Sequence, residues 1–246
     1  MTILPESKTP PVKNMERQTI LLYAHAKFGK STIAAGSPNA IFLATEAGLN
    51  HLNVYQTPIQ TWEDLLMAAK EIAEAKHSFK TVVIDTVDNA YRLCSEYICA
   101  QHNIKHESDL GYGKGWSLVN GEFQRVLTKL SLLPYGLFLI SHAVEKEIET
   151  RTGNYTRIIP TLPDKARKII LGMSDFILYG DMDSSVVQDG KTVERRVLRT
   201  KPTKHYVAGD RTGKLPETIE ATYDAFLKVY ERSIINPQTI NKKVKS

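Results

Sequence analysis

The chain alternates short, wholly apolar runs with longer segments in which apolar positions recur at helical spacing. The apolar runs predict strands at residues 20–23, 40–44, 81–85, 136–140 and 176–179, and residues 196–199 are expected to form another strand. Runs without a polar side are typical of strands that helices cover on both faces of a sheet. Strands that alternate with helices predict an α/β fold, with a mostly parallel central sheet and helices on both faces.

Helical spacing predicts the elements between these strands. A helix begins near Lys30 and ends before Pro38, and Thr61 is suited to cap a helix that runs to Ala75. The next helix is expected at residues 88–102, with Thr86 or Asp88 suited to cap it. Further helices are expected at residues 116–133, 165–173 and 217–232. Residues 145–159 predict a β-hairpin excursion with its turn at Thr152-Gly153-Asn154.

The 246 residues are enough for one α/β domain with a substantial core, which we place at residues 18–232. Residues 1–17 are expected to be a flexible lead-in, and residues 233–246 a basic flexible tail. Apolar residues make up 42% and charged residues 24% of the chain, which is typical of a globular protein. No apolar run approaches a membrane span, and the N-terminus has no secretory signal pattern.

Cysteine usage and charge refine this picture. Cys94 and Cys99 have a spacing that suits neither zinc nor a disulfide framework, so we expect packed thiols in a reducing cytoplasm. The net charge is +5, and residues 191–214 alone hold eight basic residues against two acidic ones. Such a cluster indicates a polyanionic partner, either nucleotide phosphates or nucleic acid, although a solvated charged face remains an alternative.

The strongest chemical signal is the segment after the first strand, which ends in Gly-Lys-Ser-Thr and leads into a helix. This order of strand, loop and helix is that of a phosphate-binding loop, whose backbone N–H groups surround the phosphates. The lysine reaches the β- and γ-phosphates, and the hydroxyl is a ligand of Mg²⁺. The match is imperfect, because Ala24 stands where the first glycine is expected. The expected nucleotide-binding residues are Ala24, His25, Ala26, Lys27, Phe28, Gly29, Lys30, Ser31, Thr32 and Asp85.

Polar groups also follow three other apolar strands, at Glu46, Asp85 and Ser141-His142. Ligands of an open α/β sheet bind at the carboxyl ends of its strands, so we expect these groups around the loop. Asp85 is suited to hold the metal with Ser31, and Glu46 to orient or activate the attacking water. His142 is suited to contact the γ-phosphate. Taken singly, each residue has an ordinary alternative. Glu46 could be a surface acid, Asp85 a helix cap and His142 a buried histidine with its hydrogen bonds satisfied.

Phosphoryl transfer also needs positive charge at the developing transition state, often supplied by another subunit. Arg199 and Lys201 are candidates, because on a strand their spacing would place them on one face. The catalytic candidates are therefore Glu46, Lys30, His142, Arg199 and Lys201.

Together these segments resemble RecA-like P-loop ATPases, especially the phage nucleotide-binding proteins of the AAA-like, single-strand-annealing recombinase type. AHAKFGKST resembles the Walker A motif, ATEAG the strand-end glutamate, TVVIDTVDN the Walker B motif and GLFLISH the sensor strand. LRTKPTKHY resembles the segment whose two basic residues, here Arg199 and Lys201, reach across a subunit interface. GYGKGW and AGDRTGKLP also resemble family features, with no role derived from their residues.

The resemblance implies a RecA-like core, ATP and Mg²⁺ as cofactors, and a homo-oligomer, ring or filament, with its active site at the subunit interface. It also implies single-stranded DNA as a partner, with other phage recombination or replication proteins as further candidates, in the host cytoplasm if the protein is phage-encoded. The loop after the sensor strand binds DNA in such folds, and here it contains basic residues with an interleaved aromatic. The expected DNA-binding residues are Lys146, Arg151, Tyr155, Arg157, Lys165 and Arg167.

Other interpretations stay open at this point. Acidic residues dilute the charge of the hairpin, so it can also be an ordinary solvated element. The protein could be an ATP-dependent switch or loader that acts on a protein partner without binding DNA. A small-molecule kinase would use the same loop, although no arginine-rich lid is evident. A dinucleotide-binding domain is disfavoured, because no G-x-G-x-x-G follows a strand.

Overall fold

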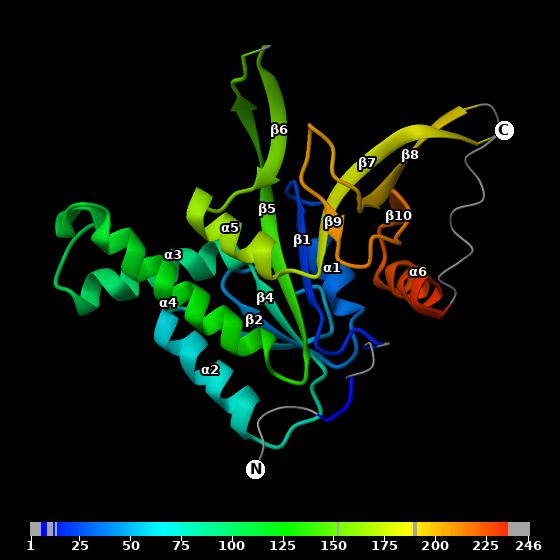
Figure 1. Cartoon of the computed structure of the whole chain (residues 1–246). Helices are drawn as coiled ribbons and strands as arrows, with labels where there is room; N and C mark the ends of the chain where they lie inside the picture. The colour runs from blue at the N-terminus through cyan, green and yellow to red at the C-terminus, as the bar shows by residue number, and fades with distance from the viewer. Residues whose placement is uncertain (1–5, 9–11, 13, 152, 189–190, 236–246) are drawn as a thin grey trace.

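The computed structural model of the chain describes residues 6–8, 12, 14–151, 153–188 and 191–235 (Figure 1). The strands are β1 (Thr19–Ala24), β2 (Ala40–Ala44), β3 (Tyr55–Pro58), β4 (Thr81–Asp85), β5 (Gly136–Ile148), β6 (Tyr155–Pro160), β7 (Phe176–Gln188), β8 (Lys191–Arg199), β9 (Gly209–Asp210) and β10 (Thr218–Glu220). The helices are α1 (Lys30–Ala35), α2 (Trp62–Glu74), α3 (Val87–Gln101), α4 (Lys114–Ser131), α5 (Asp164–Met173) and α6 (Tyr223–Ile235), with a 3₁₀ turn, η1 (Glu107–Leu110), before α4.

The strands form one sheet in the order β10-β8-β7-β1-β5-β4-β2-β3, with β6 beside β5 and β9 beside β7. The strands from β7 to β3 in this order run parallel to one another. The predicted α/β fold with a mostly parallel sheet is therefore confirmed. Because β1, β5, β4 and β2 are neighbours, their carboxyl ends meet at one edge of the sheet, where polar groups were expected.

Two apolar clusters cover the two faces of this sheet. Successive strand residues point to opposite faces. Leu21 and Leu43 therefore pack with side chains of α2, α3, α4 and α5, whereas Leu22 and Phe42 pack with α1 and α6. Figure 1 shows α6 on one side of the sheet and α3, α4 and α5 on the other. The apolar runs without a polar side are explained by this double cover.

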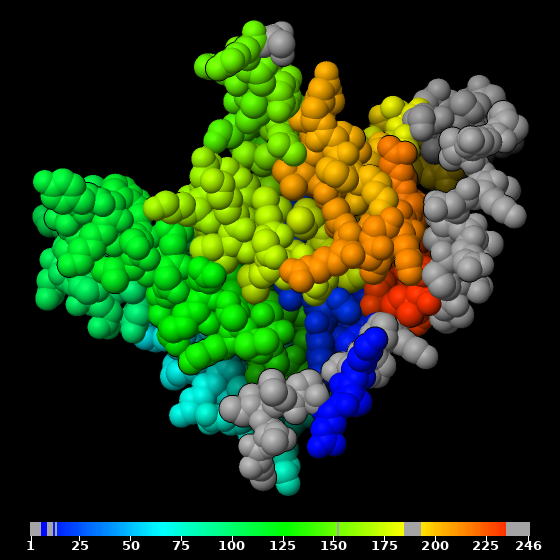
Figure 2. Space-filling model, in the orientation of Figure 1, coloured from blue at the N-terminus to red at the C-terminus, as the bar shows by residue number. Residues whose placement is uncertain are grey.

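Two pairs of strands extend beyond the central sheet. β5 pairs with β1 as far as His142 and then pairs antiparallel with β6 from Ala143 onward. The prediction that this strand closes on Ser141-His142 is thus wrong, because β5 continues to Ile148 after it changes partner. β7 and β8 are also longer than predicted, and they form a second antiparallel ribbon. Both project from the body of the molecule, the β5–β6 hairpin most clearly (Figures 1 and 2).

Other boundaries differ from the predictions. The edge strand β3 was missed, because its exposed residues carry no apolar pattern. The predicted helix at residues 217–232 is wrong at its start, where residues 218–220 form β10 against β8. Met15, in the predicted lead-in, is buried, and α6 continues to Ile235. The rest of the predicted tail, much of the lead-in and Thr152 of the predicted turn lie outside the described residues. Among the described residues, no helix has the length and apolarity needed to cross a bilayer.

Candidate functional site

The loop between β1 and α1 holds a buried lysine. Gly29 precedes the helix with a φ of 100°, a conformation that favours glycine. The Lys30 side chain turns back into the loop, and its Nζ donates to the carbonyl oxygens of Ala24 at 3.1 Å and His25 at 3.2 Å. Burial lowers the pKa of Lys30, and the nearby carboxylates of Asp85 and Glu46 oppose this shift. The ammonium is therefore held where phosphates are expected.

Ala24, which replaces the first glycine of the motif, is accommodated by a glycine on the neighbouring strand. Ala24 lies opposite Gly180 in the β1–β7 register. A Cβ atom at Gly180 would lie 2.8 Å from the Ala24 methyl and would clash with the Phe28 ring. The extra methyl group on β1 is thus matched by a missing one on β7. The sequence pattern of the loop alone could not indicate this exchange.

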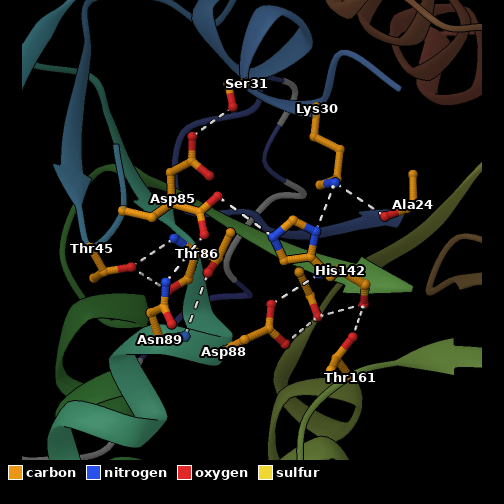
Figure 3. Close-up of polar contacts among 12 residues, drawn as sticks. Ala24, Lys30, Ser31, Thr45, Asp85, Thr86, Asp88, Asn89, His142 and Thr161 are labelled. Atoms are coloured by element: carbon orange, nitrogen blue, oxygen red, sulfur yellow. Dashed lines mark hydrogen bonds and ion pairs between the residues drawn. The ribbon is translucent and has the colours of Figure 1, made fainter. Parts of the chain in front are cut away.

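Ser31 and Asp85 meet beside the loop. The Ser31 hydroxyl donates to a carboxylate oxygen of Asp85 at 2.6 Å, and Asp85 lies at the buried end of β4 (Figure 3). Burial raises the pKa of Asp85, and the bond from Ser31 opposes this only in part. A hydroxyl beside a carboxylate offers the hard oxygen ligands that Mg²⁺ prefers. No cluster of three or more His, Cys, Asp or Glu side chains suited to a metal occurs in the described part of the chain, so any Mg²⁺ here would also need phosphate oxygens.

Glu46 and His142 face each other across the loop opening. His142 Nδ1 lies 3.4 Å from Lys30 Nζ, and its Nε2 lies 3.5 Å from Glu46 Oε1. Because an ammonium group only donates, Nδ1 accepts and the ring proton belongs on Nε2, facing the carboxylate. Asn89 donates to the other oxygen of Glu46 at 3.1 Å. Glu46 is thus held from two sides, and both it and His142 remain partly exposed.

A carboxylate that the sequence did not single out for this site fixes His142. Asp88 accepts hydrogen bonds from the Ser141 hydroxyl at 2.8 Å and from the His142 backbone N–H at 2.9 Å (Figure 3). Thr86, not Asp88 or Asp85, caps α3. Thr45 Oγ1 also accepts from the Thr86 N–H and donates to its carbonyl, both at 2.8 Å, across a cis Asp85–Thr86 peptide bond. These contacts tie the ends of β2, β4 and β5 together.

The loop between β1 and α1, together with Glu46, Asp85 and His142, lines a cavity of about 420 Å³. Of the residues expected from the sequence, it collects Ala26, Lys27, Gly29, Lys30, Ser31, Thr32, Glu46, Asp85 and His142. Ala24 and His25 contribute carbonyl groups to Lys30, and the side chain of Phe28 in the loop is buried. Four lining residues were not among the predicted site residues: Ala47, Gly48, His51, and Arg196 from β8. The Arg196 Nη1 donates to the Phe28 carbonyl at 3.1 Å. Arg196 belongs to the basic cluster, which was its only signal.

Arg199 and Lys201 do not share a strand face, because β8 ends at Arg199. Arg199 Nε lies 3.0 Å from Asp181 and its Nη1 lies 3.8 Å from Asp183. Lys201 Nζ lies 2.8 Å from the fully buried Asp210 carboxylate. The prediction of a common face is therefore wrong, and both cations have carboxylate partners in their own chain.

The expected DNA-binding residues lie on the β5–β6 hairpin and α5, but they differ in their contacts. Lys146 and Arg167 both form ion pairs with Asp164, and Arg167 also donates to the carbonyls of Pro160 and Leu162. Arg157 is partly buried, and Tyr155 packs edge-on against His205. Arg151 and Lys165 are exposed. The hairpin therefore presents less open positive charge than its composition indicates.

A parallel sheet with a phosphate loop after one strand and a carboxylate at the end of another defines the class of P-loop nucleotide-binding proteins. A family model described as an AAA domain matches residues 16–212, and the chain belongs to this family of P-loop ATPases. It is also similar to the SPbeta prophage-derived uncharacterized protein YorG of Bacillus subtilis (strain 168). The two are 25% identical over 231 residues, covering 89% of this chain and 69% of that protein.

Proposed function

We propose that this protein is a Mg²⁺-dependent ATPase of RecA-like type that binds single-stranded DNA in phage-type recombination or repair. Its contribution there would be annealing or support of strand exchange. The AAA domain and the similarity to a prophage-derived protein support the class and the setting. ATP turnover, DNA binding and assembly are proposed from the residues of the cavity, the β5–β6 hairpin and β8.

The position of His142 carries this proposal. Its ring faces Lys30 and Glu46 in the cavity, whereas its backbone is the point where β5 leaves the central sheet. The next residue, Ala143, already pairs with β6. A histidine that contacts the terminal phosphate would therefore be joined directly to the hairpin proposed to hold DNA.

The proposed reaction is attack of water on the γ-phosphorus, with formation of a P–O bond and cleavage of the bond to the ADP oxygen. Glu46 accepts the proton of the water, because its carboxylate is oriented by Asn89 and His142. Lys30 leaves its contacts with the loop carbonyls and neutralises phosphate charge. Its buried position favours this, because a desolvated ammonium gains more from an anionic partner.

Ser31 and Asp85 would hold the metal, and their oxygen ligands fit this role. When bound, Mg²⁺ supplies charge neutralisation at the phosphate oxygens. The nucleoside would extend past Thr32, which lines both the cavity of about 420 Å³ and a smaller one of about 180 Å³ beside Thr222 and Tyr223.

We also propose that Arg199 and Lys201 complete the site of a neighbouring subunit in a homo-oligomer. In that assembly they would exchange their partners Asp181 and Asp210 for phosphate. If so, mixing Arg199→Ala with Glu46→Gln protein restores part of the ATPase activity, because mixed interfaces contain one intact site. Absence of recovery in assemblies shown to be mixed would contradict the role in trans.

A second candidate function is an ATP-dependent switch or loader that acts on a protein partner. The ion pairs of Lys146 and Arg167 with Asp164 favour it, because they reduce the charge available to a nucleic acid. Nucleotide-dependent capture of a protein, without salt-sensitive DNA binding, would distinguish this candidate.

The decisive experiment measures ATP hydrolysis by the purified protein with and without single-stranded DNA, using Lys30→Ala as the inactive control. We expect DNA to stimulate hydrolysis, and DNA affinity to fall steeply with salt as counterions are released. Equal rates with and without DNA, together with no retention of DNA at low salt, would refute the DNA-binding function while leaving the ATPase intact.

A further inference from the structure

Arg196 differs from the other basic residues of its segment in reaching the phosphate loop. It lies on β8, and its Nη1 donates to the Phe28 carbonyl at 3.1 Å. A Cβ atom at Gly29 would lie only 2.9 Å from the same nitrogen. The guanidinium group therefore rests on the loop itself, beside the glycine that precedes Lys30.

The surroundings of Arg196 leave it able to bind a ligand. A guanidinium group has five N–H donors, and the bond to Phe28 uses one of them. The residue is exposed and lines the cavity that also contains Lys30, Glu46 and His142. Arginine is permanently charged, and its planar fork matches the oxygens of a phosphate group.

Arg199, three residues further along β8, is placed differently. Its guanidinium group contacts Asp181 and Asp183, and Lys201 contacts Asp210. Of these three basic residues, Arg196 is the one whose side chain lines the cavity of its own chain.

We infer that Arg196 binds the terminal phosphate of the nucleotide from within the same subunit, and that it ties the β7–β8 ribbon to the occupied loop. This inference rests on the proposed ATPase function and extends it to a residue outside the phosphate-loop motif. The lysine of such a loop reaches the β- and γ-phosphates. Arg196 approaches the same loop from β8, so it adds a cation from outside the motif to the cavity that contains Lys30.

The test compares Arg196→Ala with Arg195→Ala, its exposed neighbour on the ribbon. Successive strand residues point to opposite faces, so Arg195 is a matched control for the loss of one charge from β8. Fluorescent ATP and ADP analogues give the affinities, and phosphate release gives the turnover. We expect Arg196→Ala to weaken ATP binding about tenfold to a hundredfold, the range for a charge-assisted hydrogen bond, and to weaken ADP binding less. Arg195→Ala should stay within about twofold of wild type.

Assays of mixed variant proteins distinguish the role of Arg196 from the role proposed for Arg199. Arg196→Ala mixed with Glu46→Gln should show no recovery, because neither subunit then has a complete site, whereas the proposed role of Arg199 in trans predicts recovery. Arg196→Lys keeps the charge and should restore part of the ATP affinity. It also serves as the test if Arg196→Ala fails to fold.

Three results would overturn the inference: equal affinities for Arg196→Ala and Arg195→Ala, equal weakening of ATP and ADP, or recovery on mixing. Equal weakening would indicate that Arg196 only supports the loop. If wild-type protein binds and hydrolyses no nucleotide, the proposed function itself fails. A nucleotide-binding wild type with an unaffected Arg196→Ala variant refutes only the role of Arg196.

Discussion

The nucleotide cavity and the β5–β6 hairpin both contain charged side chains, but they arrange them in opposite ways. In the cavity, Lys30 is held by backbone carbonyls, and Glu46 is held by Asn89 and His142. On the hairpin, Lys146 meets Asp164 of α5 directly. The cavity therefore keeps charges of both signs available to a ligand, whereas a carboxylate of α5 neutralises part of the positive charge of the hairpin. Counting basic residues describes neither arrangement.

The largest expected effect comes from Glu46→Gln. The amide can still accept the hydrogen bond from Asn89 but cannot take a proton from water. We expect turnover to fall by about a hundredfold or more while ATP binding is retained, measured by phosphate release and by equilibrium binding. Glu145→Gln on the hairpin, also exposed to solvent, is the control and should leave turnover unchanged. Equal turnover in the two variants would remove Glu46 from the mechanism.

Asp85, a charged residue of the cavity, can be tested through its effect on the stability of the fold. Burial raises the pKa of its carboxyl in the folded protein, so the folded state binds this proton more tightly than the unfolded state does. Ionisation of Asp85 therefore costs folding free energy as the pH rises through the interval between the unfolded and folded pKa values. This cost persists at neutral pH.

Asp85→Asn removes that cost and keeps an acceptor for the Ser31 hydroxyl. We expect the nucleotide-free variant to melt a few degrees higher than wild type at neutral pH, while ATP turnover is lost. The difference in melting temperature should vanish at a pH below the ordinary range of an aspartate. A variant that melts lower than wild type at neutral pH would mean that the carboxylate stabilises the empty site.

On the hairpin, the exposed and the paired cations should behave differently. Arg151 and Lys165 are exposed, whereas Arg167 is bound to Asp164 and two carbonyl groups. If single-stranded DNA contacts the exposed pair, the double variant Arg151→Ala/Lys165→Ala lowers the slope of log affinity against log salt by about 0.7 for each lost phosphate contact. The control for net charge is Lys70→Ala/Lys76→Ala, which removes two exposed charges, one on α2 and one just after it. Equal slopes in the double variant and the control would place DNA elsewhere.

Much of the cavity could be predicted from the sequence, because it depends on topology. Four apolar strands end in polar residues, and in a parallel sheet such ends converge whatever the exact helix packing. The sequence therefore indicated the positions of Lys30, Glu46, Asp85 and His142. It did not indicate Asp88, because its partners Ser141 and His142 lie more than fifty residues away along the chain.

The ribbon and the hairpin were harder to predict for a related reason. A strand that passes from a buried sheet into solvent loses its apolar pattern, so β5 and β7 were predicted too short. The partners of a surface cation depend on register and side-chain direction, which spacing does not specify. Arg196 and Arg199, both on β8, accordingly reach different partners, the phosphate loop and Asp181. The exchange of Ala24 with Gly180 shows the same limit, because it joins two distant strands.

The smallest expected effect tests the connection between the two regions. Thr161 follows β6, and both its N–H and its hydroxyl donate to the His142 carbonyl at 2.9 Å. Thr161→Val keeps the first bond and removes the second, so the free energy of unfolding should fall by about 1 kcal/mol or less.

If DNA on the hairpin acts on the cavity through this carbonyl, Thr161→Val lowers DNA-stimulated hydrolysis by about twofold and leaves the rate without DNA unchanged, since 0.4 kcal/mol corresponds to roughly a factor of two. Thr161→Ser retains the hydroxyl and should behave as wild type. Both rates are read in one phosphate-release assay across a DNA titration. A Val variant with full DNA stimulation would contradict coupling through this hydrogen bond, because the Thr161 hydroxyl would then contribute only to local stability.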